Sequence, residues 1–302
     1  MVIETENLTK YYGNKIGCKD ITISVGEGEI FGFLGPNGAG KSTFIKMLVG
    51  LLFPTSGSAY VLGKPVGDVD VRKKIGYLPE NFKYQDWMTG EDLLSFHASL
   101  YKLDKKKAAS KMDEVLDIVK LKGHERFRIG TYSKGMQQRI GLACALLSDP
   151  ELLFLDEPTS ALDPVGRKEV RDIMNRLRAT GKTVLLNSHL LSEVEAVCDS
   201  VAIINKGSVV KYGKLDDILE SKFILEIHAE DLNSEVLSKL RDFDSRLSYS
   251  NNRISMDIRD RTDINDIASI ILNGGGKLFE LSPKRVSLEN VFINLIEGGD
   301  QR

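Results

Sequence analysis

Two kinds of hydrophobic pattern alternate along the chain, and together they predict an α/β fold. Short apolar runs punctuated by glycine predict buried strands, whereas apolar residues at a spacing of three or four predict helices. Their alternation over residues 1–220 is typical of an α/β domain. The strands predicted in this part are 2–8, 20–25, 29–34, 58–62, 152–155, 183–186 and 201–204.

Between about residues 86 and 150 the pattern changes to helix. Residues 90–100 carry apolar side chains at helical spacing, and so do residues 107–119, where Val115 and Val119 share one face. Strand-type runs return after this stretch. We therefore expect a helical subdomain inserted into the α/β core.

A second break in the pattern, at about residues 215–221, sets off a smaller C-terminal domain. From there the chain predicts a β-α-β-β-α-β order followed by one extra helix, so we expect an α+β, ferredoxin-like domain at 221–302. Its predicted strands are 223–229, 246–250, 253–258 and 277–281, and its predicted helices are 234–242, 264–272 and 287–295.

Composition excludes several classes of protein. The chain is 42% hydrophobic and 28% charged, with a net charge of −2, which is typical of a globular protein and gives no basic signature of nucleic-acid binding. The longest apolar runs fall far short of the about 20 residues that a membrane span needs. The N-terminus lacks the layout of a signal peptide. We expect a cytoplasmic protein, whose membrane role would come through a separate partner chain.

The cysteines point to the same compartment. Cys18, Cys144 and Cys198 have neither disulfide nor metal spacing. We therefore predict that all three are reduced and buried.

The most specific chemical signal is the segment Gly-Pro-Asn-Gly-Ala-Gly-Lys-Ser at residues 35–42. It fits the phosphate-binding loop pattern and stands between a predicted strand and a predicted helix, which argues against a chance glycine-rich turn. Glycines let backbone N–H groups converge on phosphate oxygens, and the helix N-terminus adds partial positive charge. Lys41 supplies a mobile charge, and the Ser42 hydroxyl can ligate Mg²⁺. The predicted nucleotide-binding residues here are Gly35, Pro36, Asn37, Gly38, Ala39, Gly40, Lys41, Ser42 and Thr43.

Two acids, Asp156 and Glu157, end the predicted strand 152–155. In open α/β sheets ligands bind at the carboxyl ends of the strands, so we expect Asp156 to face the Mg²⁺ of a bound nucleotide. Glu157 is then placed to orient or deprotonate the attacking water. A strand ending in acids is a weak indication alone, but it is a strong one after a phosphate-binding loop.

Taken in order, the motifs resemble those of the ATP-binding-cassette (ABC) family of ATPases over about residues 2–220. Tyr132-Ser133-Lys134-Gly135-Met136 stands at the position of the family signature, and Ser160-Ala161-Leu162-Asp163 matches the loop after the second acid, the D-loop. Asn187-Ser188-His189 matches the loop of the switch histidine. The resemblance implies a P-loop ATPase core with an inserted helical subdomain, an enzyme that binds and hydrolyses ATP with Mg²⁺.

The resemblance also implies roles for single residues. Tyr12 would stack on the adenine, with Tyr11 as the alternative, and His189 would contact the γ-phosphate unless it is an ordinary histidine at a strand end. Asp163 would belong to the D-loop. Ser133, Lys134, Gly135 and Met136 would approach the nucleotide of a second cassette.

Two positions depart from the usual family pattern. The signature has Lys134 and Met136 where Gly and Gln are common, while Ser133 and Gly135 are retained. The loop that usually carries Gln has Glu80, which can still reach Mg²⁺ or its water through an oxygen.

Both variants resemble the drug-resistance and antibiotic-export ATPases, as does the C-terminal part with Leu288-Glu289-Asn290-Val291-Phe292. We therefore expect an exporter subunit that pairs with a second copy or a similar ATPase and serves separate integral membrane permease subunits at the cytoplasmic face of the membrane. The groove near residues 80–87 would contact them, with Trp87 and Met88 as exposed candidates, unless these two pack in the core. The alternatives are a soluble ATPase of the same superfamily, or a nucleotide-gated scaffold without turnover.

Overall fold

The structure is a computed structural model that describes residues 1–160, 162–219, 223–245, 247–258, 262–285 and 287–297. It divides into two compact units, Met1–Leu215 and Asp216–Arg302. Ala161, residue 246 of the predicted strand 246–250, and residues 220 and 221 of the predicted break lie outside the described residues. Among the helices that the structure describes, none combines the length and the apolar character needed to cross a membrane.

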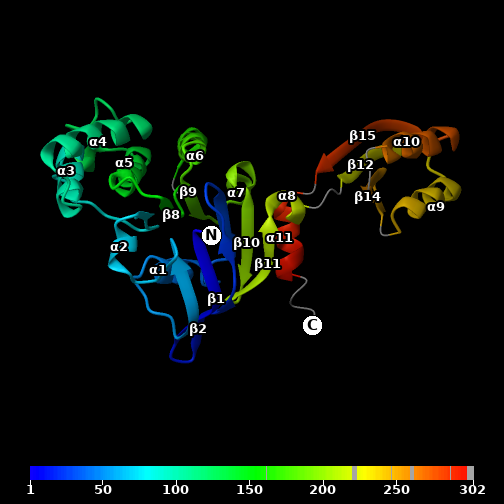
Figure 1. Ribbon diagram of the computed structural model, residues 1–302. Helices are drawn as coiled ribbons and strands as arrows, with labels where there is room; N and C mark the ends of the chain where they lie inside the picture. The colour runs from blue at the N-terminus through cyan, green and yellow to red at the C-terminus, as the bar shows by residue number, and fades with distance from the viewer. Residues whose placement is uncertain (161, 220–222, 246, 259–261, 286, 298–302) are drawn as a thin grey trace. The chain divides into compact units, whose positions relative to one another are not determined.

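The first unit contains a six-stranded sheet in the order β11-β10-β4-β9-β8-β7. All neighbours are parallel except β11, which runs antiparallel to β10. Every residue of β4, β8 and β9 is buried, as expected for parallel strands covered on both faces. The carboxyl ends of these strands therefore meet at one edge of the sheet (Figure 1). The strands are β4 Ile30–Leu34, β7 Ile75–Leu78, β8 Leu152–Asp156, β9 Thr183–Asn187, β10 Ser200–Asn205 and β11 Ser208–Lys214.

A second, antiparallel sheet is formed largely by the N-terminal part of the chain. Its order is β2-β1-β5-β6, and β3 pairs with β1. The single strand predicted at 20–25 is wrong, because the segment covers the end of β2, a break, and β3. Asp20, with φ 51°, lies inside β2 at an irregularity of its pairing with β1, and residues 22–23 separate β2 from β3. The strands are β1 Ile3–Tyr12, β2 Lys15–Ile21, β3 Ser24–Val25, β5 Ser56–Val61 and β6 Lys64–Pro65.

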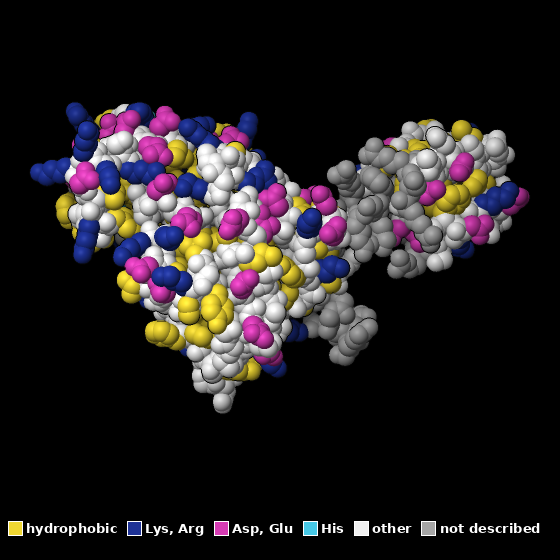
Figure 2. Space-filling view, viewed as in Figure 1, with side chains coloured by type: hydrophobic (Ala, Val, Ile, Leu, Met, Phe, Trp, Pro, Cys, Tyr) yellow, Lys and Arg dark blue, Asp and Glu magenta, His cyan; other side chains and the backbone are white. Residues whose placement is uncertain are grey.

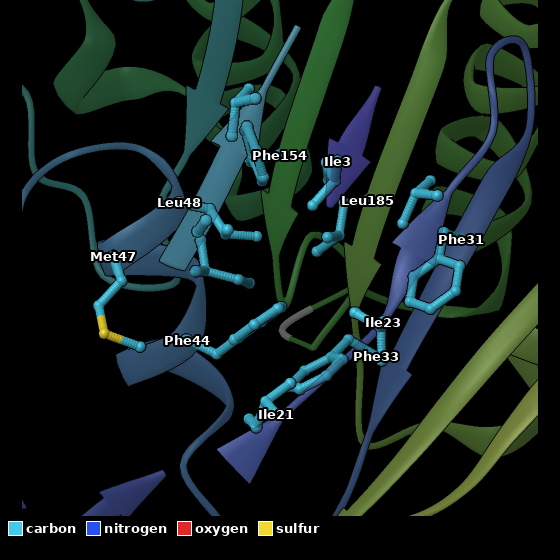
Figure 3. Close-up of a cluster of buried hydrophobic side chains, with 14 of the residues drawn as sticks. Ile3, Ile21, Ile23, Phe31, Phe33, Phe44, Met47, Leu48, Phe154 and Leu185 are labelled. Atoms are coloured by element: carbon cyan, nitrogen blue, oxygen red, sulfur yellow. The ribbon is translucent and has the colours of Figure 1, made fainter. Parts of the chain in front are cut away.

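The main hydrophobic core joins these two sheets to helix α1, Lys41–Leu48. Phe44 of α1 stacks on Phe33 of β4, with ring centroids 4.5 Å apart. Phe154 and Leu185 add side chains from β8 and β9 to the same cluster (Figure 3). This packing fixes the start of α1, and so anchors the phosphate-binding loop that connects β4 to it.

The inserted helices lie together at one side of this unit (Figure 1). Helix α3 begins after Thr89 because a capping box forms there: Asp92 N–H donates to Thr89 Oγ1 at 3.1 Å, and Thr89 N–H donates back to Asp92 Oδ2 at 3.0 Å. Acidic and basic side chains are interspersed over this region of the visible surface (Figure 2). The helices are α3 Gly90–Leu100, α4 Lys105–Ile118 and α5 Lys134–Leu146, with a 3-10 turn at Ile129–Thr131. Elsewhere in the unit are α2 Val69–Arg72, α6 Pro164–Ala179 and α7 Leu191–Val197.

The second unit has a four-stranded antiparallel sheet in the order β13-β14-β12-β15. Buried side chains of its strands and of α9 and α10 form a separate core that includes Ile227, Leu240 and Ile271. The predicted β-α-β-β-α-β order is present, while the ferredoxin-like classification stays a prediction. Helix α8, Leu215–Ile218, begins at the last residue of the first unit. The other elements are β12 Phe223–Glu230, α9 Ser234–Phe243, β13 Ser248–Ser250, β14 Arg253–Ile258, α10 Asp263–Asn273, β15 Lys277–Arg285 and α11 Leu288–Glu297.

Candidate functional site

The loop between β4 and α1 requires its glycines for its own packing. At Gly40 the backbone has φ 106°, and a Cβ there would meet the carbonyl oxygen of Gly17 at 2.0 Å. A Cβ at Gly35 would meet the carbonyl oxygen of Ile204 at 2.4 Å. Gly38 adopts φ 80° in open space. The loop can therefore bring bare backbone N–H groups toward a ligand at the N-terminus of α1.

Lys41 is the first residue of α1 and lies folded over this loop. Its Nζ donates hydrogen bonds to the carbonyl oxygens of Gly35, at 2.8 Å, and Pro36, at 3.2 Å. The side chain is buried, with 7% of its surface exposed. A bound phosphate would offer this ammonium stronger, charged acceptors than the two carbonyls.

The charges of three carboxylates act on the Lys41 ammonium. Burial lowers the pKa of Lys41, and the negative charges of Glu157, Asp156 and Glu80 counter that effect. The structure thus brings together acids that lie far apart in the sequence, since Glu80 and Glu157 are separated by more than 70 positions. In such a site the ammonium can bind the phosphate oxygens of a substrate, and the carboxylates can attract the metal ion bound to those phosphates.

A pocket of 610 Å³ opens beside the loop. Of the predicted site residues it is lined by Tyr12, Asn37, Gly38, Gly40, Lys41, Ser42, Thr43, Glu80, Glu157 and His189. Gly35 and Ala39 are buried within the loop instead, and Pro36 is half-buried. The pocket therefore collects residues from the phosphate-binding loop, from the ends of β8 and β9, and from the segment after β7.

Four lining residues were not predicted: Lys15, Ile16, Gly17 and Asn187. Gly17 carried a usable signal, because a glycine inside a strand often marks a close approach. A Cβ there would meet Tyr12 Cε2 at 2.8 Å and Thr43 Cγ2 at 3.0 Å. Asn187 also carried one, as the polar end of an apolar strand that neighbours the strand ending in two acids.

Tyr12, rather than Tyr11, lies at the pocket. The residue is 47% exposed, and the Lys10 ammonium stands 5.7 Å from the ring centroid. A half-exposed aromatic face at the pocket mouth can stack on a planar base.

Glu157 and His189 form a close polar contact just beyond the ends of β8 and β9. His189 Nδ1 lies 2.7 Å from Glu157 Oε2. Glu157 adopts φ 54°, and its N–H donates to the carbonyl of Asn187 at 2.9 Å. Burial raises the pKa of the Glu157 carboxyl, while His189 and Lys41 favour the ionised form. A carboxylate held in this way can accept a proton from water in the pocket.

Asp156 occupies the end of β8 and is 2% exposed. It accepts a hydrogen bond from Asn187 Nδ2. It is not among the residues that line the pocket, but its charge acts on Lys41, which does line it. Its carboxylate and the Ser42 hydroxyl offer oxygen donors, which are the ligands that Mg²⁺ prefers. The residues present therefore fit a magnesium ion bound with a nucleotide.

The signature residues lie elsewhere in the described structure, and none of the four lines this pocket. Ser133 is the N-cap of α5, where its Oγ accepts from Met136 N–H at 3.2 Å. Ser133 and Lys134 are exposed. Asp163 caps α6 in the same manner, accepting from Gly166 N–H at 2.8 Å. The exposed N-terminus of α5, at Ser133 and Lys134, can meet a ligand bound to another molecule.

Comparison with known proteins shows the family of this chain. The model of the ABC transporter family matches residues 18–160. The bacitracin transport ATP-binding protein of Bacillus licheniformis is 35% identical over 99% of this chain and 98% of its own length. The linearmycin resistance ATP-binding protein of Bacillus subtilis is 33% identical, over 97% of this chain and 98% of its own length.

Solved structures agree with these relatives. A structure of the ATP-binding subunit of an ABC transporter covers 72% of this chain and 92% of its own, with 33% identity and a TM-score of 0.66. A bacterial ABC transporter cassette solved as a dimer covers 71% of this chain and 99% of its own, with 25% identity and a TM-score of 0.65. This chain belongs to the ABC transporter family and is an ATP-binding subunit with the P-loop ATPase fold.

Proposed function

We propose that this chain hydrolyses Mg-ATP as the energy-coupling subunit of an ABC exporter. The observation that carries the proposal is the 2.7 Å contact between His189 Nδ1 and Glu157 Oε2 at a pocket that also contains Lys41. A base, an orienting imidazole and a phosphate-binding cation in one pocket are the parts that ATP hydrolysis needs.

In this mechanism Lys41 exchanges the carbonyls of Gly35 and Pro36 for β- and γ-phosphate oxygens. Glu157 orients the attacking water and takes its proton, and His189 holds that carboxylate and contacts the γ-phosphate. Ser42 and Asp156 would hold Mg²⁺, with Glu80 acting through a water, and the ion supplies charge neutralisation at the phosphate oxygens.

We further propose that two cassettes pair head to tail. Ser133 and Gly135 of one subunit cap the nucleotide in the other, because the exposed N-terminus of α5 is complementary to a phosphate. The partner is a second copy or a similar ATPase subunit. Hydrolysis then removes the γ-phosphate contacts and separates the pair.

Separate membrane subunits would receive this motion at the cytoplasmic face of the membrane. Trp87, 71% exposed, contributes to the contact surface, and the alternative that it packs in the core is wrong. Met88 beside it is half-buried. Trp87→Ala should weaken assembly with the membrane subunits, and unchanged assembly would remove this residue from the interface.

Export is the direction that the relatives favour. Two of them, each matched over nearly the whole chain, are named for bacitracin transport and for linearmycin resistance. A transporter subunit named for resistance to an antibiotic fits a pump that removes the antibiotic from the cell. The membrane subunits, rather than this chain, would select the substrate.

The first test is turnover of Glu157→Gln. The variant should bind ATP and accumulate as a dimer while the turnover number falls roughly 100-fold or more. Glu27→Gln, an exposed acid-to-amide change away from the pocket, serves as the matched control. Unchanged turnover of Glu157→Gln would remove Glu157 as the base.

A second variant tests the phosphate-binding loop itself. Lys41→Ala should lose ATP affinity, because it removes the buried ammonium that faces the phosphates. Binding of ATP at the wild-type level by this variant would contradict the assignment of the loop.

The membrane partner is tested by affinity capture from detergent-solubilised native membranes, with Glu157→Gln and Mg-ATP as bait and Lys41→Ala as the control bait. Recovery of a polytopic membrane protein with the first bait alone supports the transporter. Recovery of soluble partners alone, with wild-type hydrolysis intact, would favour a soluble ATPase of the same superfamily.

A further inference from the structure

Asn187 contacts both acids that follow one another at the end of β8, Asp156 and Glu157. It is the last residue of β9, and the parallel register places it beside Asp156, the last residue of β8. Its side-chain Nδ2 donates a hydrogen bond to Asp156 Oδ1. The residue is 1% exposed, so the amide makes this contact out of bulk solvent.

The main chain of Asn187 holds the second acid. Its carbonyl oxygen accepts a hydrogen bond from the N–H of Glu157 at 2.9 Å. Glu157 has the unusual backbone angle φ 54° at this point. Any residue at position 187 could provide that carbonyl. The hydrogen bond to Asp156, by contrast, depends on the asparagine side chain.

The amide of Asn187 is left with one unused polar atom. Oδ1 is buried and has no hydrogen-bond partner among the described residues, although Asn187 lines the pocket. Rotating the amide by half a turn would set its oxygen against the Asp156 carboxylate, so that carboxylate fixes which atom remains free. A buried acceptor without a partner is costly, and it calls for a donor that arrives with the occupant of the pocket.

The chemistry of that donor follows from the neighbours of Asn187. Lys41 and Ser42 line the same pocket, and Asp156 is bonded to the same amide. Mg²⁺ keeps several water molecules when it binds with phosphates, and a metal-bound water donates hydrogen bonds but accepts them poorly. An acceptor-only oxygen next to a carboxylate is suited to such a water.

We propose that Asn187 is a positioning residue for magnesium: its Nδ2 fixes the Asp156 carboxylate, and its Oδ1 accepts a hydrogen bond from a water of the bound metal ion. The identity of the occupant as Mg-ATP rests on the proposed function. Partners of this kind, one step away from the metal, commonly change metal affinity by 10- to 100-fold, which is in the order of magnitude expected here.

The test compares Asn187→Leu with Thr183→Val. Both changes replace a buried polar side chain of β9 by an apolar one of similar size, but Thr183 lies at the far end of the strand, where its hydroxyl accepts from Gly28 N–H at 2.9 Å. The readout is equilibrium binding of a fluorescent ATP analogue, titrated with Mg²⁺ and repeated in EDTA. Thermal melting of each variant reports its fold.

Asn187→Leu should bind the analogue in EDTA as the wild type does. The Mg²⁺ concentration that gives half of the maximal increase in analogue binding should rise roughly tenfold. Thr183→Val should leave that concentration unchanged. Turnover of Asn187→Leu at limiting Mg²⁺ should recover, at least in part, as Mg²⁺ is raised. A wild-type magnesium dependence in folded Asn187→Leu overturns the inference.

Asn187→Ser provides the second variant if the leucine prevents folding. It removes the amide but leaves a small side chain that the strand end accommodates, so the same rise in half-maximal Mg²⁺ is expected and its absence again overturns the inference. A wild-type protein that binds Mg-ATP without hydrolysing it contradicts the proposed function alone, because the magnesium titration still decides the role of Asn187.

Discussion

Arg171 and Glu193 form an ion pair that joins α6 to α7. Arg171 Nη1 lies 2.7 Å from Glu193 Oε1, and the Glu193 side chain is 7% exposed. Helix α6 begins after Asp163, and α7 begins shortly after His189. The pair therefore holds together the two helices that follow the D-loop and the loop of His189.

Arg171→Ala should lower the free energy of unfolding by about 3 kcal/mol, because it leaves Glu193 buried without its cation. Urea denaturation of the nucleotide-free protein measures the change. Lys74→Ala is the matched control, since it breaks the exposed Lys74–Glu151 pair, 2.8 Å apart, and should cost less than about 1 kcal/mol. Equal losses in the two variants would contradict the structural weight given to the buried pair.

Gly40→Ala should disrupt the phosphate-binding loop even without nucleotide. The new Cβ would meet the carbonyl oxygen of Gly17 at 2.0 Å, at a residue with φ 106°, so the backbone must move. We expect a loss of at least about 2 kcal/mol in stability together with weaker ATP binding. Differential scanning calorimetry and a binding titration measure the two effects.

Gly38→Ala is the contrast for that change. It has a positive φ of 80° but nothing within 4 Å of the added methyl group, so only the conformational strain of about 1 kcal/mol applies. If Gly38→Ala were as destabilising as Gly40→Ala, the close approach of Gly17 would not be the cause.

The sequence predicted most elements of this fold because their patterns are local. Residues 90–100 and 253–258 were predicted as a helix and a strand, and α3 and β14 have these bounds. The strand at 208–214, β11, was missed: its residues are exposed or half-buried, so no apolar run marks it. The separation of β1 and β5 from the parallel sheet was also missed, because pairing partners are not written in a local pattern.

Prediction of the site had the same limit. The loop at 35–42 can be predicted from its local sequence motif alone. Glu80, Glu157 and His189, also predicted, line the pocket beside it. Asn187 acquires its importance only from the register that places it beside Asp156, a contact between two strands 31 positions apart. The exposed N-terminus at Ser133 is visible in the structure, but the partner that would meet it is not part of this chain.

The cysteines should be inert in the folded protein. All three are free and buried, which confirms the prediction made from their spacing. Burial raises the pKa of Cys18 to about 11 and that of Cys144 to about 12, and it raises the pKa of Cys198 as well. A chromogenic thiol reagent that forms mixed disulfides should therefore label none of them at about pH 8 in the native state, and all 3 in urea. Rapid labelling of native Cys18, beside the nucleotide pocket, would contradict its burial.

The stability of the nucleotide-free protein should depend on pH through Glu157. Burial raises the pKa of this carboxyl in the folded state, so the native protein holds the proton more tightly than the unfolded chain does. The resulting stability is complete below the ordinary glutamate pKa and is lost as the pH rises through the raised one. Glutamine cannot ionise, so Glu157→Gln should gain stability over the wild type as the pH rises from the ordinary glutamate pKa toward neutral pH.

Urea denaturation across this range measures the gain, and a second pair of proteins removes the competing imidazole. In the His189→Ala background the carboxylate loses the partner that favours its charged form, at 2.7 Å, so the gain from Glu157→Gln should be larger there. Glu27→Gln, at an exposed position, is the control for changing an acid to an amide outside the pocket. A constant difference for Glu157→Gln in both backgrounds would mean that burial does not control this carboxyl, and the case for a base with a raised pKa would fail with it.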